Sequence, residues 1–573
     1  MAMSRLLLPL VAAFLLARPL PAQVRTKFGV LIPMRDGVRL AADIWLPEAN
    51  GRYPVLVART PYMKTGLGLN QWATYFAKRG YVFVIQDTRG RGDSEGRFNF
   101  LFPEGKDGFD TIEWLARQPW SNGRVGTLGL SYLGSVQWLA AREHPPHLVC
   151  MAPTAAAGRW FEEIPWSGGA FLHAFALNWL NQTAGRAEQS PNGETANWTK
   201  VLAHRPLLTA DSVFGRSMPM YREWLTHSTS DAYWNRLRFT PKDFAGITIP
   251  TLTTTGWYDG DQPGALFYWR GVMTNRASAD RHFLVVGPWR HIETFRGGSV
   301  KVGDTEFSAE SVIDTKAVHL AFFDWCLKNE SERFDAPRAR VYVTGANVWR
   351  TFDSYPPAGA APRTLYLTSG GKANTSAGDG KLVWDTSDSP PDRFSFDPKN
   401  PVPDDMESWG VDRQSTQKRS DVLVYTSDAL TEPVDVIGSV VVNLQAASDA
   451  RDTDFTAALT DVLPDGRAIS LGPFVGIRRA RYRNGYTSEQ LLTPGKVENF
   501  RIELFDIAHS FAPGHRIRLE ISSSASPLYN PNQNTGNPVA TDTVWKVAQQ
   551  TIYHDRAHAS ALLLPVLVRK QTP

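Results

Sequence analysis

The chain has 573 residues, of which 42% are hydrophobic and 21% are charged, and its formal net charge at pH 7 is +4. This length is too great for one hydrophobic core and predicts two to four structural units. The charges form no block of one sign, so the sequence lacks the basic surface that binds nucleic acid or anionic membranes. We therefore expect neither nucleic acid nor a membrane as a partner of the mature protein.

The first 23 residues, MAMSRLLLPLVAAFLLARPLPAQ, are typical of a secretory signal. Arg5 supplies the positive charge at the start, and an apolar run follows at positions 6–17. This run is shorter than the roughly 20 residues that span a bilayer. We predict cleavage after Ala22, which makes residues 1–22 the signal, and export of the mature chain to the periplasm or the extracellular space.

The chain has two cysteines, Cys150 and Cys326, and both lie in apolar segments. Export would permit a disulfide between them. We expect two buried free thiols instead, because cysteine is often simply buried. No Cys/His spacing is typical of a metal site, and we expect neither a metal nor a cofactor.

Residues 23–155 alternate between predicted strands and predicted helices. Strands are expected at residues 38–47, 53–60, 81–90, 124–131 and 147–155. Helices are expected at residues 70–80, at residues 108–118 and from Tyr132 onward. This alternation predicts a parallel sheet flanked by helices.

The pattern then changes twice along the chain. Residues 156–245 are rich in Trp, Asn and Ser, show short helical pieces and no clear strands, and are predicted to be an inserted helical cap. The α/β pattern returns at residues 246–335. From residue 336 to 573 short strands alternate with turn residues, beginning with ARVYVTG, which predicts an all-β sandwich or jelly roll.

Ser131 lies between a predicted strand and a predicted helix in the segment TLGLSYLGSVQWLAA. A serine at this place is either a catalytic nucleophile or the N-cap of the helix. The usual nucleophile motif is G-x-S-x-G, and here Gly129 is present but Leu133 occupies the second glycine position, with the glycine shifted to 134. The motif by itself therefore favours the cap.

Two residues further along the chain favour the nucleophile. Asp259 in TTTGWYDGD and His291 in FLVVGPWRH each follow an apolar, strand-like run. The order Ser, Asp, His, with each residue beyond the carboxyl end of a strand, is that of α/β-hydrolases. A serine hydroxyl needs a histidine to accept its proton and a carboxylate to orient that histidine. The sequence thus predicts a triad of Ser131, Asp259 and His291.

Such a triad also needs hydrogen-bond donors for the oxyanion that forms during the reaction. The backbone N–H of Tyr132, directly after the serine, is the first expected donor. The second should come from the loop after the strand at residues 53–60, which reads PYMK and has no glycine-rich stretch. The phenol of Tyr62 is the candidate there, and a purely packing role for this ring is the open alternative.

Five segments, RTPYMK, QDTRGRGDSEG, GLSYLG, GWYDG and GPWRH, together resemble the CocE/NonD family of serine hydrolases. This family includes cocaine esterase, X-prolyl dipeptidyl-peptidases, glutaryl acylases and α-amino-acid ester hydrolases. Its serine motif reads G-x-S-Y-x-G, so Gly134 stands where the family has its glycine. The resemblance implies an α/β-hydrolase fold with an inserted helical cap, followed by an all-β jelly-roll-like C-terminal domain, and it implies the same roles for the residues above.

In the α-amino-acid ester hydrolases a cluster of carboxylates near the triad holds the ammonium group of the substrate, and two of its members closely follow the triad aspartate. Asp261 matches one of these, but Gln262 is not acidic. Glu162 and Glu163, in RWFEEIPW on the cap, are candidates to complete an acidic pocket. Charge that simply faces solvent is the alternative for all three carboxylates.

The sequence therefore predicts an exported serine hydrolase that cleaves ester or amide bonds of small acyl substrates, among them α-amino acyl groups, through an acyl-enzyme. The expected partner is a small-molecule or short-peptide substrate. One alternative is an X-prolyl dipeptidyl-peptidase of the same family. Another is an exported binding protein without catalysis, in which a hydrolase scaffold carries a polysaccharide-binding β-domain; the complete triad favours the enzyme.

Overall fold

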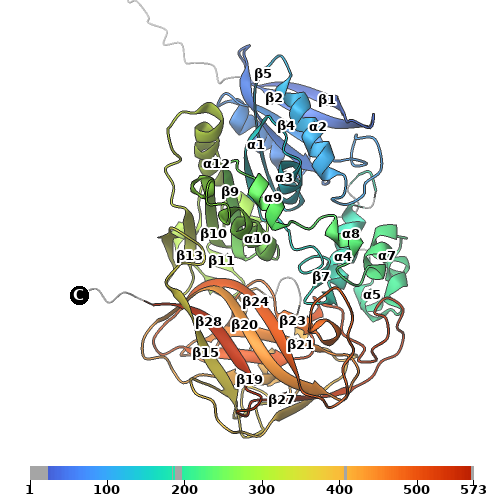
Figure 1. The fold of residues 1–573 in the computed structure, drawn as a ribbon, viewed down its shortest axis with the longest axis vertical. Helices are drawn as coiled ribbons and strands as arrows, with labels where there is room; N and C mark the ends of the chain where they lie inside the picture. The colour runs from blue at the N-terminus through green and yellow to red at the C-terminus, as the bar shows by residue number, and fades with distance from the viewer. Residues whose placement is uncertain (1–23, 184, 188–195, 405–408, 569–573) are drawn as a thin grey trace, which may run out of the picture.

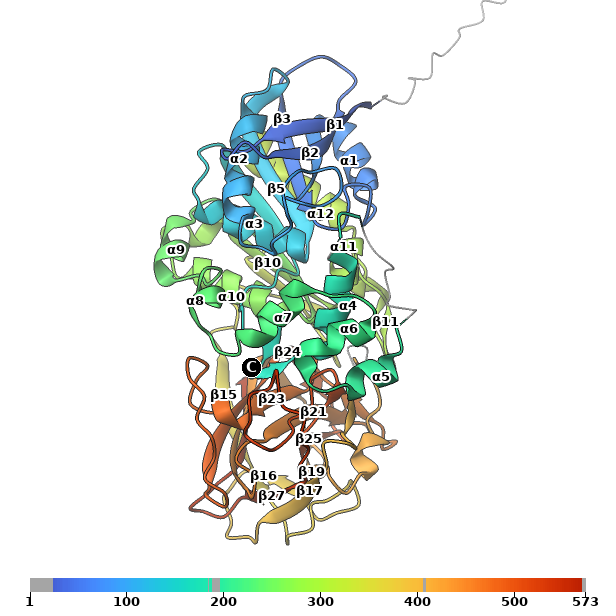
Figure 2. The same ribbon diagram turned by 90° about the vertical axis from the view of Figure 1, so that its right-hand side faces the viewer.

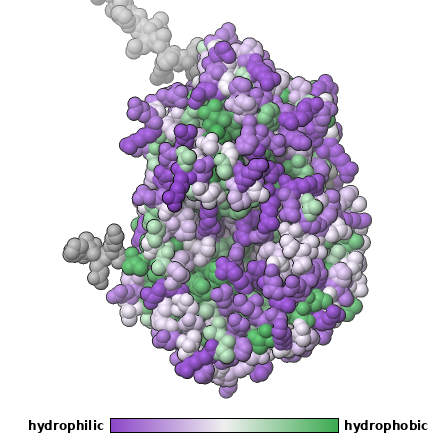
Figure 3. Space-filling model, viewed as in Figure 1, coloured by the Kyte–Doolittle hydropathy of each residue, from purple (hydrophilic) through white to green (hydrophobic). Residues whose placement is uncertain are grey.

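The computed structural model describes residues 24–183, 185–187, 196–404 and 409–568. The predicted signal at residues 1–22 lies outside this part of the chain. Two large sheets, each with its own core, lie one above the other, and the cap helices lie beside their junction (Figure 1). Within the described residues no helix is long and apolar enough to cross a membrane. The face drawn in Figure 3 is mainly hydrophilic, with small separate hydrophobic patches.

The first sheet has ten strands in the order β1-β2-β4-β3-β5-β6-β9-β10-β13-β14. Neighbouring strands from β4 to β13 run parallel, and β1, β2 and β14 add antiparallel pairs at the two ends. Every residue of β4 and β9 is buried, as expected for a parallel sheet with helices on both faces. The strand bounds are Arg25–Pro33 (β1), Arg39–Leu46 (β2), Tyr53–Thr60 (β3), Val82–Asp87 (β4), Ser121–Leu130 (β5), Leu148–Thr154 (β6), Thr251–Tyr258 (β9), His282–Arg290 (β10), Ala339–Val343 (β13) and Val348–Phe352 (β14).

Helices cover both faces of this sheet (Figure 2). Helices α2 (Glu104–Ala116) and α3 (Tyr132–Arg142) pack together on one face. Helices α1 (Leu69–Ala77) and α12 (Thr315–Phe323) meet on the other, where the rings of Trp72 and His319 lie 5.1 Å apart. This is the α/β-hydrolase arrangement that the sequence predicts, with α10 (Gln262–Met273) following β9.

One predicted strand belongs to a different sheet from the one we expected. The sequence predicts ARVYVTG as the first strand of the all-β region, but β13 pairs in parallel with β10 and antiparallel with β14. The first sheet therefore continues beyond residue 335 to Phe352. The strand pattern of β13 is the same in either sheet, and the partner is decided by the buried side chains Val341, Tyr342 and Val343, which pack in a core shared with β9 and β10.

The cap between β6 and β9 is helical, as predicted, and also contains a short hairpin of β7 (Trp166–Ser167) and β8 (Ala170–Phe171). Buried tryptophans, among them Trp166, Trp224 and Trp234, belong to the same hydrophobic core as the first sheet. In Figure 2 the helices α4 to α7 lie between the first sheet and the β-domain. The helices are α4 (His173–Thr183), α5 (Trp198–Ala203), α6 (Ala210–Phe214), α7 (Pro219–Thr226), α8 (Ala232–Asn235) and α9 (Pro241–Gly246).

The C-terminal domain is all-β, as predicted, and its 12-stranded sheet is antiparallel except where β16 pairs with β19. Its core is separate from that of the first sheet and contains Phe455, Phe500 and Phe511. The strands are β15 (Ala360–Thr368), β16 (Lys381–Val383), β17 (Asp392–Phe396), β19 (Leu423–Thr426), β20 (Val434–Ser448), β21 (Asp454–Val462), β22 (Ala468–Ser470), β23 (Gly476–Arg479), β24 (Glu498–Phe511), β25 (Arg516–Ser522), β27 (Ala548–Tyr553) and β28 (Ala561–Leu567).

The prediction of two free thiols is wrong, because Cys150 and Cys326 form a disulfide. Cys150 lies on β6, and Cys326 lies in the π-helical segment Asp324–Lys328 that continues α12. The two residues are 176 positions apart in sequence, and the packing of this helical segment against β6 brings their Cα atoms to 6.4 Å. The sequence around each cysteine gives no indication that the two residues are close in the fold.

Candidate active site

Ser131 occupies the sharp turn between β5 and α3. Its backbone has φ 66° and ψ −125°, in a region that residues other than glycine rarely adopt. Among the described residues no hydrogen bond from its side chain caps α3. The N-cap alternative is therefore not supported, and the side chain of Ser131 lies instead on the wall of a cavity of about 540 Å³.

The two glycines around Ser131 allow this turn. A Cβ at Gly129, whose φ is 147°, would lie 2.4 Å from the Cβ of Leu133. A Cβ at Gly134 would lie 2.7 Å from the carbonyl oxygen of Thr154, at the end of β6. Because α3 packs this tightly against β6, a side chain at position 134 would displace the helix, and this accounts for the glycine there.

His291 and Asp259 come together at the ends of neighbouring strands β10 and β9. The Nδ1 atom of His291 lies 2.8 Å from Oδ1 of Asp259, which is fully buried. The carboxylate of Asp259 also accepts hydrogen bonds from the hydroxyl of Thr255 at 2.9 Å and from the backbone N–H of Asp261 at 3.0 Å. These contacts fix the imidazole so that its Nε2 atom is the nitrogen left for Ser131, whose side chain lines the same cavity.

The charge around His291 favours its protonated form. Burial is the largest single effect and lowers the pKa of His291. The charge and hydrogen bond of Asp259 and the charges of Asp261 and Glu293 together outweigh it and raise the pKa to about 9. An imidazolium is the species that arises when a serine transfers its proton to histidine. The site is therefore built to stabilise the charge that nucleophilic attack creates.

Both residues predicted for the oxyanion hole lie on the same cavity wall as Ser131. Tyr132 is the first residue of α3, so its backbone N–H has no acceptor within the helix. The phenol oxygen of Tyr62 accepts a hydrogen bond of 2.9 Å from the indole N–H of Trp179 on the cap. This bond directs the hydroxyl hydrogen of Tyr62 away from Trp179.

The ring of Tyr132 anchors the start of α3 in the core. Its hydroxyl donates to the carbonyl oxygen of Phe100 at 2.6 Å and contacts Oε1 of Glu104 at 3.0 Å. Glu104 is fully buried and forms an ion pair of 2.7 Å with Arg59. The sequence carries no signal for this network, because its members lie on β3, α2 and α3 and meet only in the folded protein.

The cavity is formed by three parts of the chain. The α/β region contributes Ser131, His291 and three of the aromatic side chains, the cap contributes four more, and the C-terminal domain closes one side with Trp409 and Phe474. The aromatic residues on its wall are Tyr62, Phe100, Tyr132, Trp160, Phe175, Trp179, Trp224, Trp409 and Phe474. Sequence reasoning did not single out the cap and β-domain members; the abundance of tryptophan was their only signal.

The structure places the three candidate carboxylates in different positions. Asp261 lines the cavity, with Oδ2 3.9 Å from Nδ1 of His291, and only 8% of this residue is exposed. Burial raises the pKa of Asp261 to about 7, although His291 opposes this. Glu162 forms ion pairs with Arg159 and Arg238 and lies outside this cavity.

Glu163 is buried behind the cavity wall, and its carboxylate is hydrogen-bonded to backbone groups. Its carboxylate accepts hydrogen bonds from the backbone N–H groups of Gly158, Arg159 and Gly264, at 2.9–3.0 Å. Burial and the neighbouring charge of Asp261 raise the pKa of Glu163 to about 8. The alternative of solvent-facing charge is therefore wrong for Glu163 and Asp261, because both are buried, and of the three carboxylates only Asp261 reaches the cavity.

An α/β-hydrolase sheet with serine, aspartate and histidine at the ends of its strands defines a serine hydrolase. Comparison with known proteins agrees. Residues 36–293 match the family described as X-Pro dipeptidyl-peptidase (S15 family), and residues 332–563 match the X-Pro dipeptidyl-peptidase C-terminal non-catalytic domain. The chain belongs to the CocE/NonD family of serine hydrolases, which carries these two domains.

Three relatives show how far the similarity extends. Cocaine esterase from Rhodococcus sp. (strain MB1 Bresler) is 34% identical, over 94% of this chain and 98% of the relative. The structure of an α-amino acid ester hydrolase matches with a TM-score of 0.85 and 26% identity, covering 97% of this chain and 98% of the other. An aminopeptidase from the marine sediment archaeon Thaumarchaeota archaeon matches with a TM-score of 0.83 and 26% identity, covering 96% and 97%.

Proposed function

We propose that this serine hydrolase is exported and cleaves small carboxylic esters with a bulky apolar acyl group, through an acyl-enzyme on Ser131. One observation carries the proposal. The hydroxyl of Ser131 caps no helix within the described residues and opens into the cavity that also exposes His291, whose Nδ1 is held by the buried carboxylate of Asp259.

In the proposed reaction, Oγ of Ser131 attacks the carbonyl carbon of the ester while Nε2 of His291 takes the hydroxyl proton. The negative oxygen of the tetrahedral intermediate accepts hydrogen bonds from the N–H of Tyr132 and the hydroxyl of Tyr62. When the intermediate collapses, the C–O bond breaks and the imidazolium protonates the departing alcohol. Water then attacks the acyl-enzyme by the same steps and releases the acid.

The size and lining of the cavity support a bulky, apolar acyl group. A volume of about 540 Å³ is within the range of small-molecule sites, and the walls are largely aromatic. Rings of this kind stack on flat apolar groups at little cost in conformational freedom. The similarity to cocaine esterase over nearly the whole chain agrees with an ester substrate.

A second candidate is hydrolysis of α-amino acyl esters or amides, and Asp261 favours it. Its carboxylate lines the cavity beside His291, where an ammonium group on the acyl chain would find a counter-charge. The structural match to an α-amino acid ester hydrolase supports this candidate. X-prolyl dipeptidyl-peptidase activity, suggested by the family description, is the third outcome that a substrate panel separates.

Two features of the chain support export. The first 23 residues are typical of a secretory signal. The disulfide between Cys150 and Cys326 agrees with an oxidising compartment, since such bonds persist outside the cytosol and are rare within it.

The test is active-site labelling followed by a substrate panel. A fluorophosphonate probe is expected to label the wild type and not Ser131→Ala, while Ser135→Ala, one turn further along α3, stays labelled. Aryl esters of aromatic acids should be turned over faster than amino-acid esters and Xaa-Pro anilides. No labelling of folded wild type would favour the non-catalytic binding protein, and turnover of Xaa-Pro anilides alone would overturn the esterase proposal.

A further inference from the structure

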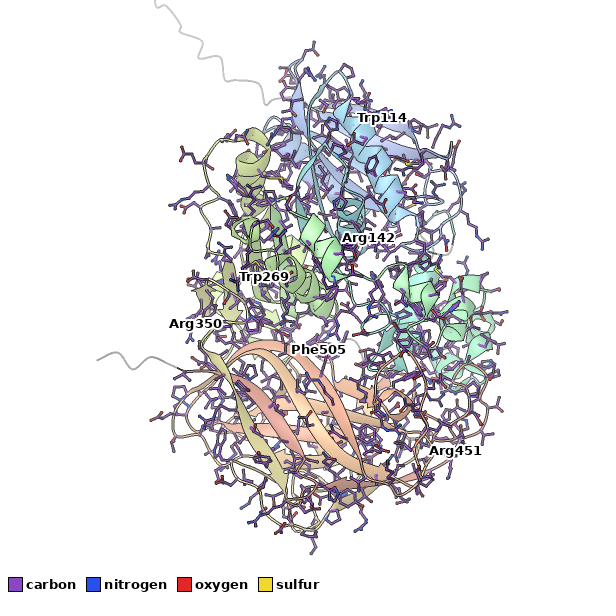
Figure 4. All side chains as sticks on the ribbon, viewed as in Figure 1. Trp114, Arg142, Trp269, Arg350, Arg451 and Phe505 are labelled. Atoms are coloured by element: carbon purple, nitrogen blue, oxygen red, sulfur yellow. A yellow bond between two sulfur atoms is a disulfide. The ribbon has the colours of Figure 1, made fainter. Side chains whose placement is uncertain are left out.

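A second cavity, of about 280 Å³, lies where the first sheet, the cap and the C-terminal domain meet, and we call it the interdomain cavity. It shares no lining residue with the active-site cavity. One wall is α10, one is the segment 159–168, and the floor is formed by β20, β23 and β24. Figure 4 labels Phe505, one of its lining residues, at the edge of the β-domain that faces the first sheet.

The floor of this cavity is irregular in a specific way. Strands β20 and β24 pair Ser439 with Asp506 and then Val441 with Glu503, so β24 carries one extra residue between these pairs. Phe505 lies in this bulge with φ 67°, which is an uncommon backbone conformation for an aromatic residue. Such local strain persists where the surrounding structure requires it, frequently at binding sites.

The charges around the interdomain cavity do not balance. Four arginines line it, against three carboxylates; the arginines are Arg159, Arg270, Arg478 and Arg501, and the carboxylates are Glu162, Glu503 and Asp506. Arg159 pairs with Glu162 and Glu503, and Arg270 pairs with Asp506. The remaining two arginines are left without a carboxylate partner in the part of the chain that the structure describes.

Arg478 is only 9% exposed, so its charge is held in a largely buried place. Its Nε donates to the carbonyl oxygen of Arg501 at 3.0 Å, and its Nη1 donates to the carbonyl oxygen of Tyr482 at 3.5 Å. Among the described residues Nη2 has no hydrogen-bond acceptor, and the guanidinium of Arg501 has none either. The neighbouring carboxylate of Glu503 is shared by Arg159, Arg478 and Arg501, so one positive charge is left over beside a largely buried guanidinium, which points to an anionic occupant.

The pKa of the neighbouring carboxylate of Glu503 also reflects the positive charge of these arginines. Burial raises the pKa of Glu503, but Arg159, Arg501 and Arg478 outweigh this effect and hold the pKa below its ordinary value. The rest of the lining is mixed. It includes the polar side chains of Ser167, Gln262 and Ser439 and the rings of Phe267, Phe505 and Tyr486, and the ring of Tyr486 lies under the guanidinium of Arg478 at 4.8 Å. The cavity thus combines donors for one anionic group with flat apolar surfaces.

We propose that the interdomain cavity binds a small aromatic carboxylate. The carboxylate would accept hydrogen bonds from Nη2 of Arg478 and from the guanidinium of Arg501, and the ring would lie against Phe505. A single negative charge matches the excess of one arginine over the carboxylates. Gln262 on α10 is hydrogen-bonded to the backbone of Asp506 on the cavity floor, so the cavity lies at a contact between the two domains. A bound ligand would add contacts to both domains at this place.

The experiment measures binding of benzoate to the full chain by calorimetry and by the shift in Tm, with benzyl alcohol as the uncharged match. Benzoate is also a product of the proposed reaction, and the imidazolium of His291 and the oxyanion donors favour a carboxylate in the active-site cavity as well. Neither Arg478 nor Arg501 lines that cavity, so the part of benzoate binding that their substitution removes belongs to the interdomain cavity. Arg478→Met and Arg501→Met should each weaken benzoate binding about 10–100-fold, as expected for loss of a charge-assisted hydrogen bond.

The matched control is Arg393→Met, an exposed arginine on β17. It should bind benzoate as the wild type does. Arg501 is also exposed, so Arg501→Met keeps the test valid if Arg478→Met fails to fold. The proposal would be overturned if benzoate does not bind, binds no better than benzyl alcohol, or binds Arg501→Met as well as the wild type. Ester turnover by these variants is expected to continue, and this measurement tests the proposed function separately.

Discussion

Asp261 places a second carboxylate close to the histidine of the triad. Its Oδ2 lies 3.9 Å from Nδ1 of His291, while Asp259 already holds that nitrogen at 2.8 Å. Both charges favour the imidazolium and contribute to the raised pKa of His291. Since only the neutral imidazole can accept the proton of Ser131, these charges decide the pH below which the enzyme loses activity.

The variant Asp261→Asn is expected to move the acidic limb of the kcat/KM profile to lower pH. Removing the carboxylate removes one of the charges that raise the pKa of His291, so the imidazole becomes neutral at a lower pH. The measurement is kcat/KM for a neutral aryl ester between pH 5 and pH 10. A limb that stays in place would show that Asp261 is already neutral when His291 titrates.

Tyr62 is the second residue whose role can be measured directly. The variant Tyr62→Phe should lower kcat by roughly 10²–10³, as loss of one oxyanion donor does, with a smaller change in KM. Tyr53→Phe is the matched control, because this phenol donates to the carbonyl oxygen of Ala49 away from the cavity. A wild-type rate for Tyr62→Phe would place the second donor elsewhere.

The segment from β5 through Ser131 into α3 shows how an element sets the chemistry. Helix α3 packs against β6, and the absence of a side chain at Gly134 permits this contact. The same helix begins with Tyr132, which is anchored through its hydroxyl to Phe100 and Glu104. The position of the Tyr132 N–H therefore depends on contacts along the whole first turn.

Gly134→Ala is expected to reduce both stability and turnover. The new Cβ would lie 2.7 Å from the carbonyl oxygen of Thr154 and 3.0 Å from the Cβ of Ala156, so α3 must move away from β6. A strain of about 1–3 kcal/mol is expected in urea unfolding, with a loss of kcat. Gly359→Ala meets only a flexible leucine side chain at 3.3 Å and serves as the control; equal effects of both changes would contradict this explanation.

Across the whole molecule, three regions far apart in sequence build one active site. The first sheet supplies the predicted triad, the cap supplies Trp160 and Trp179, and the β-domain supplies Trp409 and Phe474. The disulfide also joins distant regions covalently, because the chain between Cys150 and Cys326 contains the cap and two strands of the first sheet. The cavity exists only when these parts are assembled.

Cys326→Ser is expected to lower the free energy of unfolding by about 2–5 kcal/mol, as removal of a native disulfide does. The activity of the folded variant at 25 °C should change little, because neither cysteine lines the cavity. The measurement is the urea midpoint of the variant and of the wild type, each with and without reductant. A midpoint of the variant equal to that of the oxidised wild type would contradict a stabilising bond.

Much of this protein could be predicted without coordinates. Periodicity in the sequence is local, so it identified the parallel α/β region, the helical cap and the all-β C-terminal region. The residues Ser131, Asp259 and His291 follow strands in a recognisable order, and the ends of parallel strands meet at one edge of a sheet. The resemblance to a known family also rested on short local motifs, and this family is confirmed.

What the sequence alone did not decide were contacts between distant segments. The sheet that β13 joins, the disulfide, the burial of Glu163 and the closure of the cavity by Phe474 each depend on partners more than fifty residues away. The evidence against the N-cap alternative for Ser131 is a backbone conformation and a cavity, which exist only in the folded chain. Local patterns determine which elements form, whereas charge, burial and cavities arise from how those elements pack.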